Sequence, residues 1–148
     1  MAQGYFDKWE PSIGEWLEMA ESAIARGPTG GWQANAAFLL HQAAERAYAC
    51  FLLVQTLYFP RSHNIKFLRS LAEDKEPRLV EAWPRLNKID RRRFELLKRA
   101  YVEARYSPSY AITADDLEAL AVSVERLREV VAMLCRERLG GLRAAAAA

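Results

Sequence analysis

The chain has 148 residues and a mass of 16.8 kDa, a length that suits a single domain with one hydrophobic core. Hydrophobic residues make up 51% and charged residues 27%, which excludes a disordered chain, and no apolar run reaches the roughly 18 residues that a membrane span needs. The formal net charge of +2 is too small for bulk attraction to nucleic acid, so any basic surface has to be local.

Residues 1–11 lack the basic start and the apolar stretch of a signal peptide, and we expect them to be a lead or linker in a cytoplasmic protein. The spacing of Ser12 and Glu15 matches a capping box, which predicts that the first helix begins there. Gly27 and Pro28 then predict its end.

Residues 32–59 carry apolar side chains around nearly the whole circumference of a helix, so this second helix should lie at the centre of the domain. Ala36, Ala43 and Ala47 form a patch of small residues that would let a neighbouring helix approach closely. Cys50 and Cys135 both fall in helical apolar patterns, where we interpret them as inert core residues.

The next segment predicts a short amphipathic helix with Ser62 as its N-cap, followed by a connection that Pro77 and Pro84 interrupt. A further helix is expected from about Asp90 to Tyr106, because the residue before a proline is pushed out of the helical region at Ser107-Pro108.

The last helix has the clearest pattern. Thr113 and Asp116 form a second capping-box pair, apolar residues repeat at three-four spacing, and Gly140-Gly141 predicts its end. Strand-like alternation is almost absent. The sequence therefore predicts an all-α fold, a four-to-five-helix up-and-down bundle that forms one domain over residues 12–140, with an Ala-rich tail at 141–148.

One charged residue stands out on the helix before Ser107. At 100° per residue, Phe94, Leu97, Tyr101 and Ala104 form an apolar stripe, and Arg105 projects from that same stripe. A lone buried guanidinium is costly, so Arg105 is expected to have a partner or a ligand. Two interpretations stay open: an ion pair with Glu45 that fixes helix register, or a phosphate receptor.

Other polar residues give weaker signals. His41 and Glu45 lie one turn apart on a flank of the central helix, either as satisfied structural side chains or as groups that face Arg105 across a cleft. His63 suits a turn, and the RRRFELLKR run suits a solvated face more than a nucleic-acid contact. No phosphate loop, metal-ligand cluster or nucleophilic triad is present, so neither a metal nor a cofactor is expected.

Three blocks in chain order carry a family resemblance: LLHQAAERAYACFLL, PRSHNIKFL and LLKRAYVEARYSPSYAIT. Together they resemble the HEPN domain family, whose name stands for higher eukaryotes and prokaryotes nucleotide-binding. The resemblance implies a helical bundle that commonly forms homodimers and often works beside a minimal nucleotidyltransferase, either fused to it or as a separate partner.

Many HEPN proteins are metal-independent ribonucleases whose motif is an arginine followed, after four to six residues, by a histidine. Arg105 matches the arginine by its context, but Tyr110 stands where a histidine would come after a four-residue spacer. Tyrosine, with an ordinary pKa of about 10, is a poor general base near neutral pH. This departure counts against ribonuclease activity, and no catalytic residue is firm.

The favoured hypothesis is therefore a HEPN nucleotide-binding or interaction module that acts with a nucleotidyltransferase and lacks chemistry of its own. Its candidate nucleotide- or phosphate-binding residues are Arg105, His41, Glu45, Tyr106 and Tyr110. The alternative is a divergent, toxin-like endoribonuclease in which Arg105 stabilises the phosphate and His41 acts as the base. A third possibility is a purely structural dimerisation domain.

Overall fold

The computed structural model describes all 148 residues, and its regular elements are all helical. In chain order they are α1 (Ala2–Ala25), α2 (Trp32–Thr56), α3 (Ile65–Lys75), the 3-10 helix η1 (Pro77–Ala82), α4 (Lys88–Tyr106) and α5 (Ala114–Ala147). The predicted all-helical bundle is confirmed. None of these helices combines the length and the apolar character that crossing a bilayer requires.

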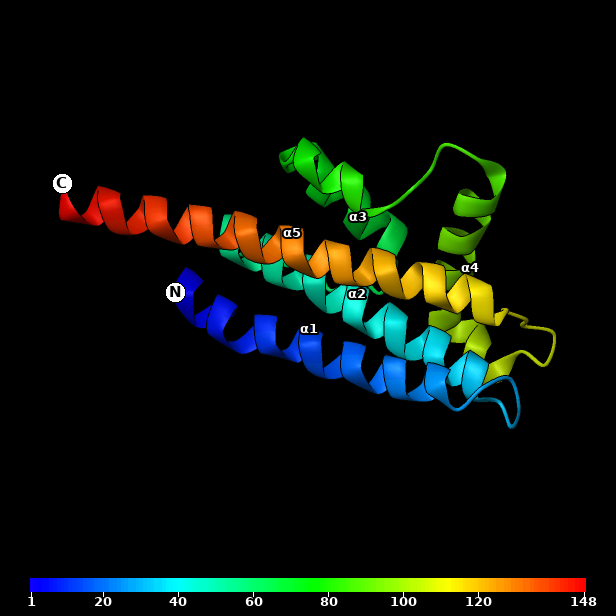
Figure 1. The fold of residues 1–148 in the computed structure, drawn as a ribbon. Helices are drawn as coiled ribbons and strands as arrows, with labels where there is room; N and C mark the ends of the chain where they lie inside the picture. Colours follow the sequence, from blue (N-terminus) through cyan, green and yellow to red (C-terminus); the bar gives the residue numbers. More distant parts are fainter.

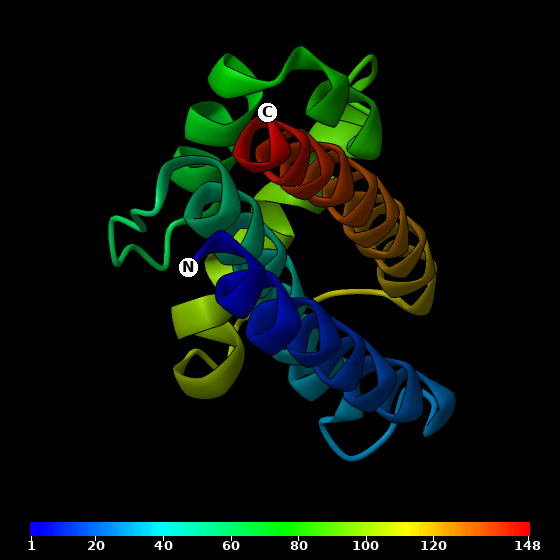
Figure 2. The same cartoon turned by 90° about the vertical axis from the view of Figure 1, so that its left-hand side faces the viewer.

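The three long helices α1, α2 and α5 lie side by side and form the body of the molecule (Figure 1). Both chain termini lie at one end of this body, the end that faces the viewer in Figure 2. The α3 helix covers α2 near that end, whereas α4 runs steeply across the opposite end (Figure 1). The chain segment that joins α3 to α4 runs from the middle of the bundle toward the end opposite the termini (Figure 1).

The second helix is the centre of the core, as its apolar circumference predicts. Tyr48, Phe51 and Leu40 on α2 have at most 1% of their surface exposed, and α1, α3, α4 and α5 all pack against it. The alanine patch has no exposed surface either. Cys50 and Cys135 are free and buried, which confirms that they belong to the core.

The first helix begins eleven residues earlier than its capping-box pattern indicates. Its N-cap is Met1, and the helix runs without interruption through Pro11. Proline lacks the N–H that would bond the carbonyl of Asp7, but Asp7 and Pro11 are both exposed, so water can satisfy that carbonyl. Trp9 packs on the core from this added segment, and its burial outweighs the missing hydrogen bond.

Two other predicted boundaries also shift. The N-cap of α3 is Asn64, whose side chain accepts from the amides of Lys66 and Phe67, and Ser62 only supports the turn before it. The last helix passes through Gly140-Gly141 and ends near the chain terminus. Glycine permits a left-handed C-cap but does not impose one, and the alanines that follow favour helix.

The junction between α4 and α5 depends on a buried carboxylate. Asp116 is 1% exposed and forms the predicted capping box with Thr113, which the structure confirms. Its Oδ1 also accepts hydrogen bonds from Arg92 Nη2 and Arg93 Nε, each at 2.9 Å. Burial by itself would raise the pKa of Asp116, but the hydrogen bonds from Arg93 and Thr113 outweigh it and lower the pKa below its ordinary value.

We expect Asp116→Ala to lower the free energy of unfolding by about 2 to 4 kcal/mol, because it removes both the helix cap and a buried, charge-assisted anchor. Urea denaturation at pH 7 measures this difference. Asp115→Ala is the matched control, since Asp115 is exposed in the same turn.

Because the pKa of Asp116 is lowered on folding, the contribution of Asp116 to the free energy of unfolding is complete above about pH 3.9 and is lost as the pH falls below that value. Equal stability of the two variants at pH 7 would contradict this role.

Candidate functional site

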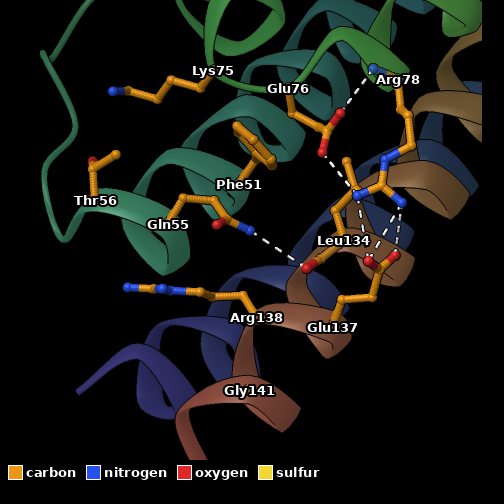
Figure 3. Close-up of a pocket in the computed structure, with 10 residues that line it drawn as sticks. All are labelled: Phe51, Gln55, Thr56, Lys75, Glu76, Arg78, Leu134, Glu137, Arg138 and Gly141. Carbon is orange, nitrogen blue, oxygen red and sulfur yellow. Dashed lines mark hydrogen bonds and ion pairs between the residues drawn. The ribbon is translucent and has the colours of Figure 1, made fainter. Parts of the chain in front are cut away.

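A surface hollow of about 480 Å³ lies between the ends of α2 and α3 and the later turns of α5 (Figure 3). Arg78 crosses its wall and is neutralised, with Nη2 2.8 Å from Glu76 Oε1 and Nη1 3.1 Å from Glu137 Oε2. Lys75 and Arg138 extend into solvent on the other side of the hollow (Figure 3). None of the site residues predicted from the sequence lines it.

Arg105 lies on the surface, and its predicted inward orientation is wrong. It occupies the last turn of α4, and its side chain is exposed. The guanidinium turns back along its own helix, and Nη2 and Nε donate to the carbonyl of Tyr101 at 2.7 and 3.1 Å. It makes no ion pair with Glu45, so the predicted buried Arg105–Glu45 pair is also wrong.

Aromatic rings surround the Arg105 guanidinium. Its central carbon lies 4.6 Å from the ring centre of Phe38 and 5.1 Å from those of Tyr101 and Tyr106. These contacts and the two hydrogen bonds hold the cation in place. No carboxylate approaches it within ion-pair distance. Arg105 is thus a fixed, exposed cation that is free to accept an anionic partner.

His41 lies inside the core instead of facing a cleft. It has no exposed surface, and its Nε2–H donates to the backbone carbonyl of His63 at 3.0 Å. This bond leaves Nδ1 as an acceptor, 3.9 Å from the acceptor oxygen Oε2 of Glu45, which explains why neither atom has a hydrogen-bond partner. Burial lowers the pKa of His41 to about 4.

Glu45 pairs with His63, a contact that the sequence pattern did not indicate. His63 Nδ1–H donates to Glu45 Oε1 at 2.5 Å, from a side chain that is 56% exposed to one that is 10% exposed. Burial raises the pKa of Glu45, and the hydrogen bond from His63 opposes that rise. His41 and Glu45 therefore hold the backbone and the ring of His63, and together fix the loop between α2 and α3.

Tyr101 connects His63 to Arg105. The ring of His63 stacks on that of Tyr101 with a centroid distance of 4.3 Å and an interplanar angle of 12°. Because Arg105 contacts the same tyrosine, the exposed imidazole and the exposed guanidinium belong to one surface. We call it the Arg105 surface, made up of Phe38, His63, Tyr101, Arg105 and Tyr106.

The two other predicted tyrosines differ in their availability. Tyr106 is 73% exposed and presents a free aromatic face. Tyr110 is half-buried, and its hydroxyl donates to the carbonyl of Leu96 at 2.7 Å. Burial raises the pKa of Tyr110 well above its ordinary range. The residue in the place of the motif histidine therefore anchors the loop after α4.

A cavity of about 380 Å³ lies next to the Glu45–His63 pair. Glu45 and His63 form one part of its wall, and Trp9 and Phe59 supply apolar surface. Arg46, at its edge, donates to Gln42 Oε1 at 2.6 Å and lies over the ring of Trp16. No three His, Cys, Asp or Glu side chains anywhere in the structure converge closely enough to hold a metal ion.

We predict that the imidazole of His41 stays neutral, with its proton on Nε2, from pH 8 down to about pH 5. A pH titration of the ring nitrogens by 15N NMR measures this, and His63→Gln assigns the remaining signal. The unfolded chain takes up this proton near pH 6.5 whereas the folded chain does so at about pH 4. The contribution of His41 to the free energy of unfolding is thus complete above pH 6.5 and falls by about 3 kcal/mol as the pH approaches 4. A His41 midpoint near 6.5 would contradict the buried, neutral state.

Comparison with known families gives one match. The model of the HEPN domain matches residues 14–137, from the middle of α1 to the last third of α5. A search of curated proteins found no similar sequence. The match confirms the resemblance seen in the three sequence blocks, and it supports a module that interacts with nucleotides or RNA in general terms. The chain belongs to the HEPN domain family.

Proposed function

We propose that this HEPN domain binds the phosphate of a nucleotide or RNA at the Arg105 surface, acts with a nucleotidyltransferase domain or partner, and has no catalytic activity of its own. One observation carries the binding proposal: Arg105 is exposed, is fixed by two hydrogen bonds, and has no carboxylate partner. A guanidinium in this state offers a phosphate its remaining N–H donors at little cost in conformational entropy.

The aromatic rings beside Arg105 suit the rest of such a ligand. Tyr106 is exposed and lies next to the guanidinium, so a base attached to the bound phosphate can stack on it. His63 is also exposed, and its ring nitrogen Nδ1 is already committed to Glu45. The surface thus combines one anion receptor with stacking faces, the combination used for single-stranded nucleic acid and nucleotides.

The absence of catalysis in this proposal is supported by the state of the two proton acceptors that the sequence suggested, His41 and Tyr110. His41 is buried, and its ring faces only the His63 carbonyl and Glu45. Tyr110 donates its hydroxyl proton to a backbone carbonyl. A general base has to reach the proton that it removes, directly or through one water molecule, and neither group meets that condition.

The nucleotidyltransferase partner is supported by the family resemblance of the sequence blocks. A homodimer has additional support from α4, where Val102 and Tyr106 lie one turn apart on the surface and are 57% and 73% exposed. An apolar pair of this kind on one helix face suits contact with a second copy of the chain.

The binding proposal predicts that ATP, GTP or a short single-stranded RNA binds the wild-type protein, and that Arg105→Ala weakens this binding about tenfold or more. Isothermal titration calorimetry measures the affinity, and gel analysis of the RNA after incubation in EDTA should show it intact. Arg143→Ala is the matched control, because it removes an exposed arginine from the far end of α5.

Equal affinity of the wild-type and Arg105→Ala proteins for every ligand would contradict a phosphate site at Arg105. Cleavage of the RNA that disappears in Arg105→Ala would contradict the proposed lack of catalysis and favour the endoribonuclease alternative.

The homodimer proposal predicts that light scattering gives twice the chain mass for the wild-type protein, and that Val102→Glu shifts the mass toward the monomer because it places a charge in the contact. Val122→Glu is the control, since Val122 is also exposed, at 66%, but lies on α5. A monomeric wild-type protein, or an unchanged dimer in Val102→Glu, would argue against this interface.

A further inference from the structure

A second basic site lies between α3 and the first half of α4. The cavity has a volume of about 290 Å³, and its lining contains four cations, Lys66, Arg69, Arg85 and Arg91, against the single carboxylate of Glu95. Arg91 precedes Arg105 by 14 residues on the same helix, a rise of about 20 Å along the α4 axis, and no residue of the Arg105 surface lines the cavity. It is therefore a separate site.

The carboxylates near this cavity already have partners. Glu73 accepts two hydrogen bonds from Arg85, at 2.9 and 2.7 Å, and Glu95 pairs with Lys98 at 3.2 Å. Lys66, Arg69 and Arg91 make no ion pair within the protein. Arg91 is held at the rim, where its Nη1 donates to the carbonyl of Arg85 at 3.0 Å. The cavity consequently keeps an excess of positive charge.

Arg69 is held in place by an aromatic ring. Its guanidinium carbon lies 3.8 Å from the ring centre of Phe94, which packs edge-on against Trp83 at 4.9 Å and 77°. Trp83 in turn donates its indole N–H to the hydroxyl of the buried Tyr48 at 2.7 Å. This chain of contacts joins the Arg69 platform to the centre of the core, so the guanidinium is pre-positioned.

Arg69 also has a hydrogen-bonding capacity that the protein leaves unused. Its Nε–H is buried, and no side chain or carbonyl of the protein accepts from it. Burial lowers the pKa of Arg69, and the neighbouring Arg85 lowers it further. An anion in the cavity would accept from Arg69 and offset the repulsion between the two guanidinium groups.

We propose that this cavity is a phosphate-binding site in which Arg69 is the central receptor and Lys66 and Arg91 complete the contact from the rim. Guanidinium groups match the geometry of phosphate oxygens, and the two exposed rim cations allow entry from solvent. The phosphate belongs either to a free polyphosphate group, such as that of a nucleoside triphosphate, or to the backbone of an RNA. Arg91 begins the RRRFELLKR run, so this site gives part of that basic segment a function.

The experiment titrates the full-length protein with inorganic pyrophosphate and, separately, with a short single-stranded RNA. The readouts are calorimetric affinity and the 15N NMR signal of the Arg69 side-chain Nε–H. Arg69→Gln tests the central receptor. Lys66→Gln/Arg91→Gln tests the rim cations and keeps the contact between Arg69 and Phe94. This second variant still tests the proposal if Arg69→Gln fails to fold. The control, Lys8→Gln/Arg143→Gln, removes two exposed cations from α1 and α5.

We expect the Arg69 Nε–H signal to shift on binding, and the affinity to fall about tenfold or more in both site variants while the control keeps most of it. Pyrophosphate binding with this pattern identifies a free polyphosphate ligand, and the same pattern with RNA alone identifies the RNA backbone. An unchanged Arg69 signal with both ligands, or an equal loss in the control, would overturn the proposal. The Arg105→Ala protein should keep this pyrophosphate binding. That result distinguishes binding at the basic cavity from binding at the Arg105 surface.

Discussion

The burial of α2 on nearly all sides is the constraint on which the rest of the structure depends. Every other α-helix packs on it, and three of its polar side chains, His41, Gln42 and Glu45, are at most 8% exposed. Buried polar groups need partners, and the loop after α2 provides them for His41 and Glu45, because its His63 accepts from His41 with its carbonyl and donates to Glu45 with its ring. The central helix thereby fixes the loop that presents the exposed imidazole beside Tyr101 and Arg105.

The distribution of carboxylates decides which of the arginines are structural. Asp116 binds Arg92 and Arg93 at the α4–α5 junction, Glu73 binds Arg85, and each of these pairs ties two segments together. Arg69 and Arg105 instead rest on aromatic rings and have no carboxylate partner. Aromatic faces hold a guanidinium in position without neutralising it, so these two arginines retain their charge for a ligand.

The two unpaired sites lie toward opposite ends of α4, and this gives the helix a double role. Its apolar stripe, with Phe94 and Leu97, packs into the core, while its ends carry the basic cavity at Arg91 and the Arg105 surface. A nucleic-acid strand bound along the helix would span about 20 Å between them, a few nucleotides in length. The two proposed sites both suit a phosphate-containing ligand, and the family match supports a module that interacts with nucleotides or RNA in general.

Much of the fold follows from local patterns. The apolar circumference of α2, the Thr113–Asp116 capping box and the Ser107-Pro108 stop were all predictable, because each depends on residues close together in the sequence. The start of α1 was not, because the burial of Trp9 against the core outweighs the local signal at Ser12 and Pro11. Membership of the HEPN family was also accessible from sequence, since its three blocks keep their order along the chain.

What the sequence by itself determined is therefore the helical class, the central helix, the family and the importance of Arg105 as a residue to explain. Only the tertiary structure decided where that arginine points and which partners Glu45, Asp116 and Arg69 have. The helical period gives the direction of a side chain around the helix axis, but it does not tell which parts of the helix other elements cover. Arg105 shares a stripe with core residues, yet its side chain is exposed, because it lies in the last turn of α4, beyond Ala100, the last buried residue of that helix.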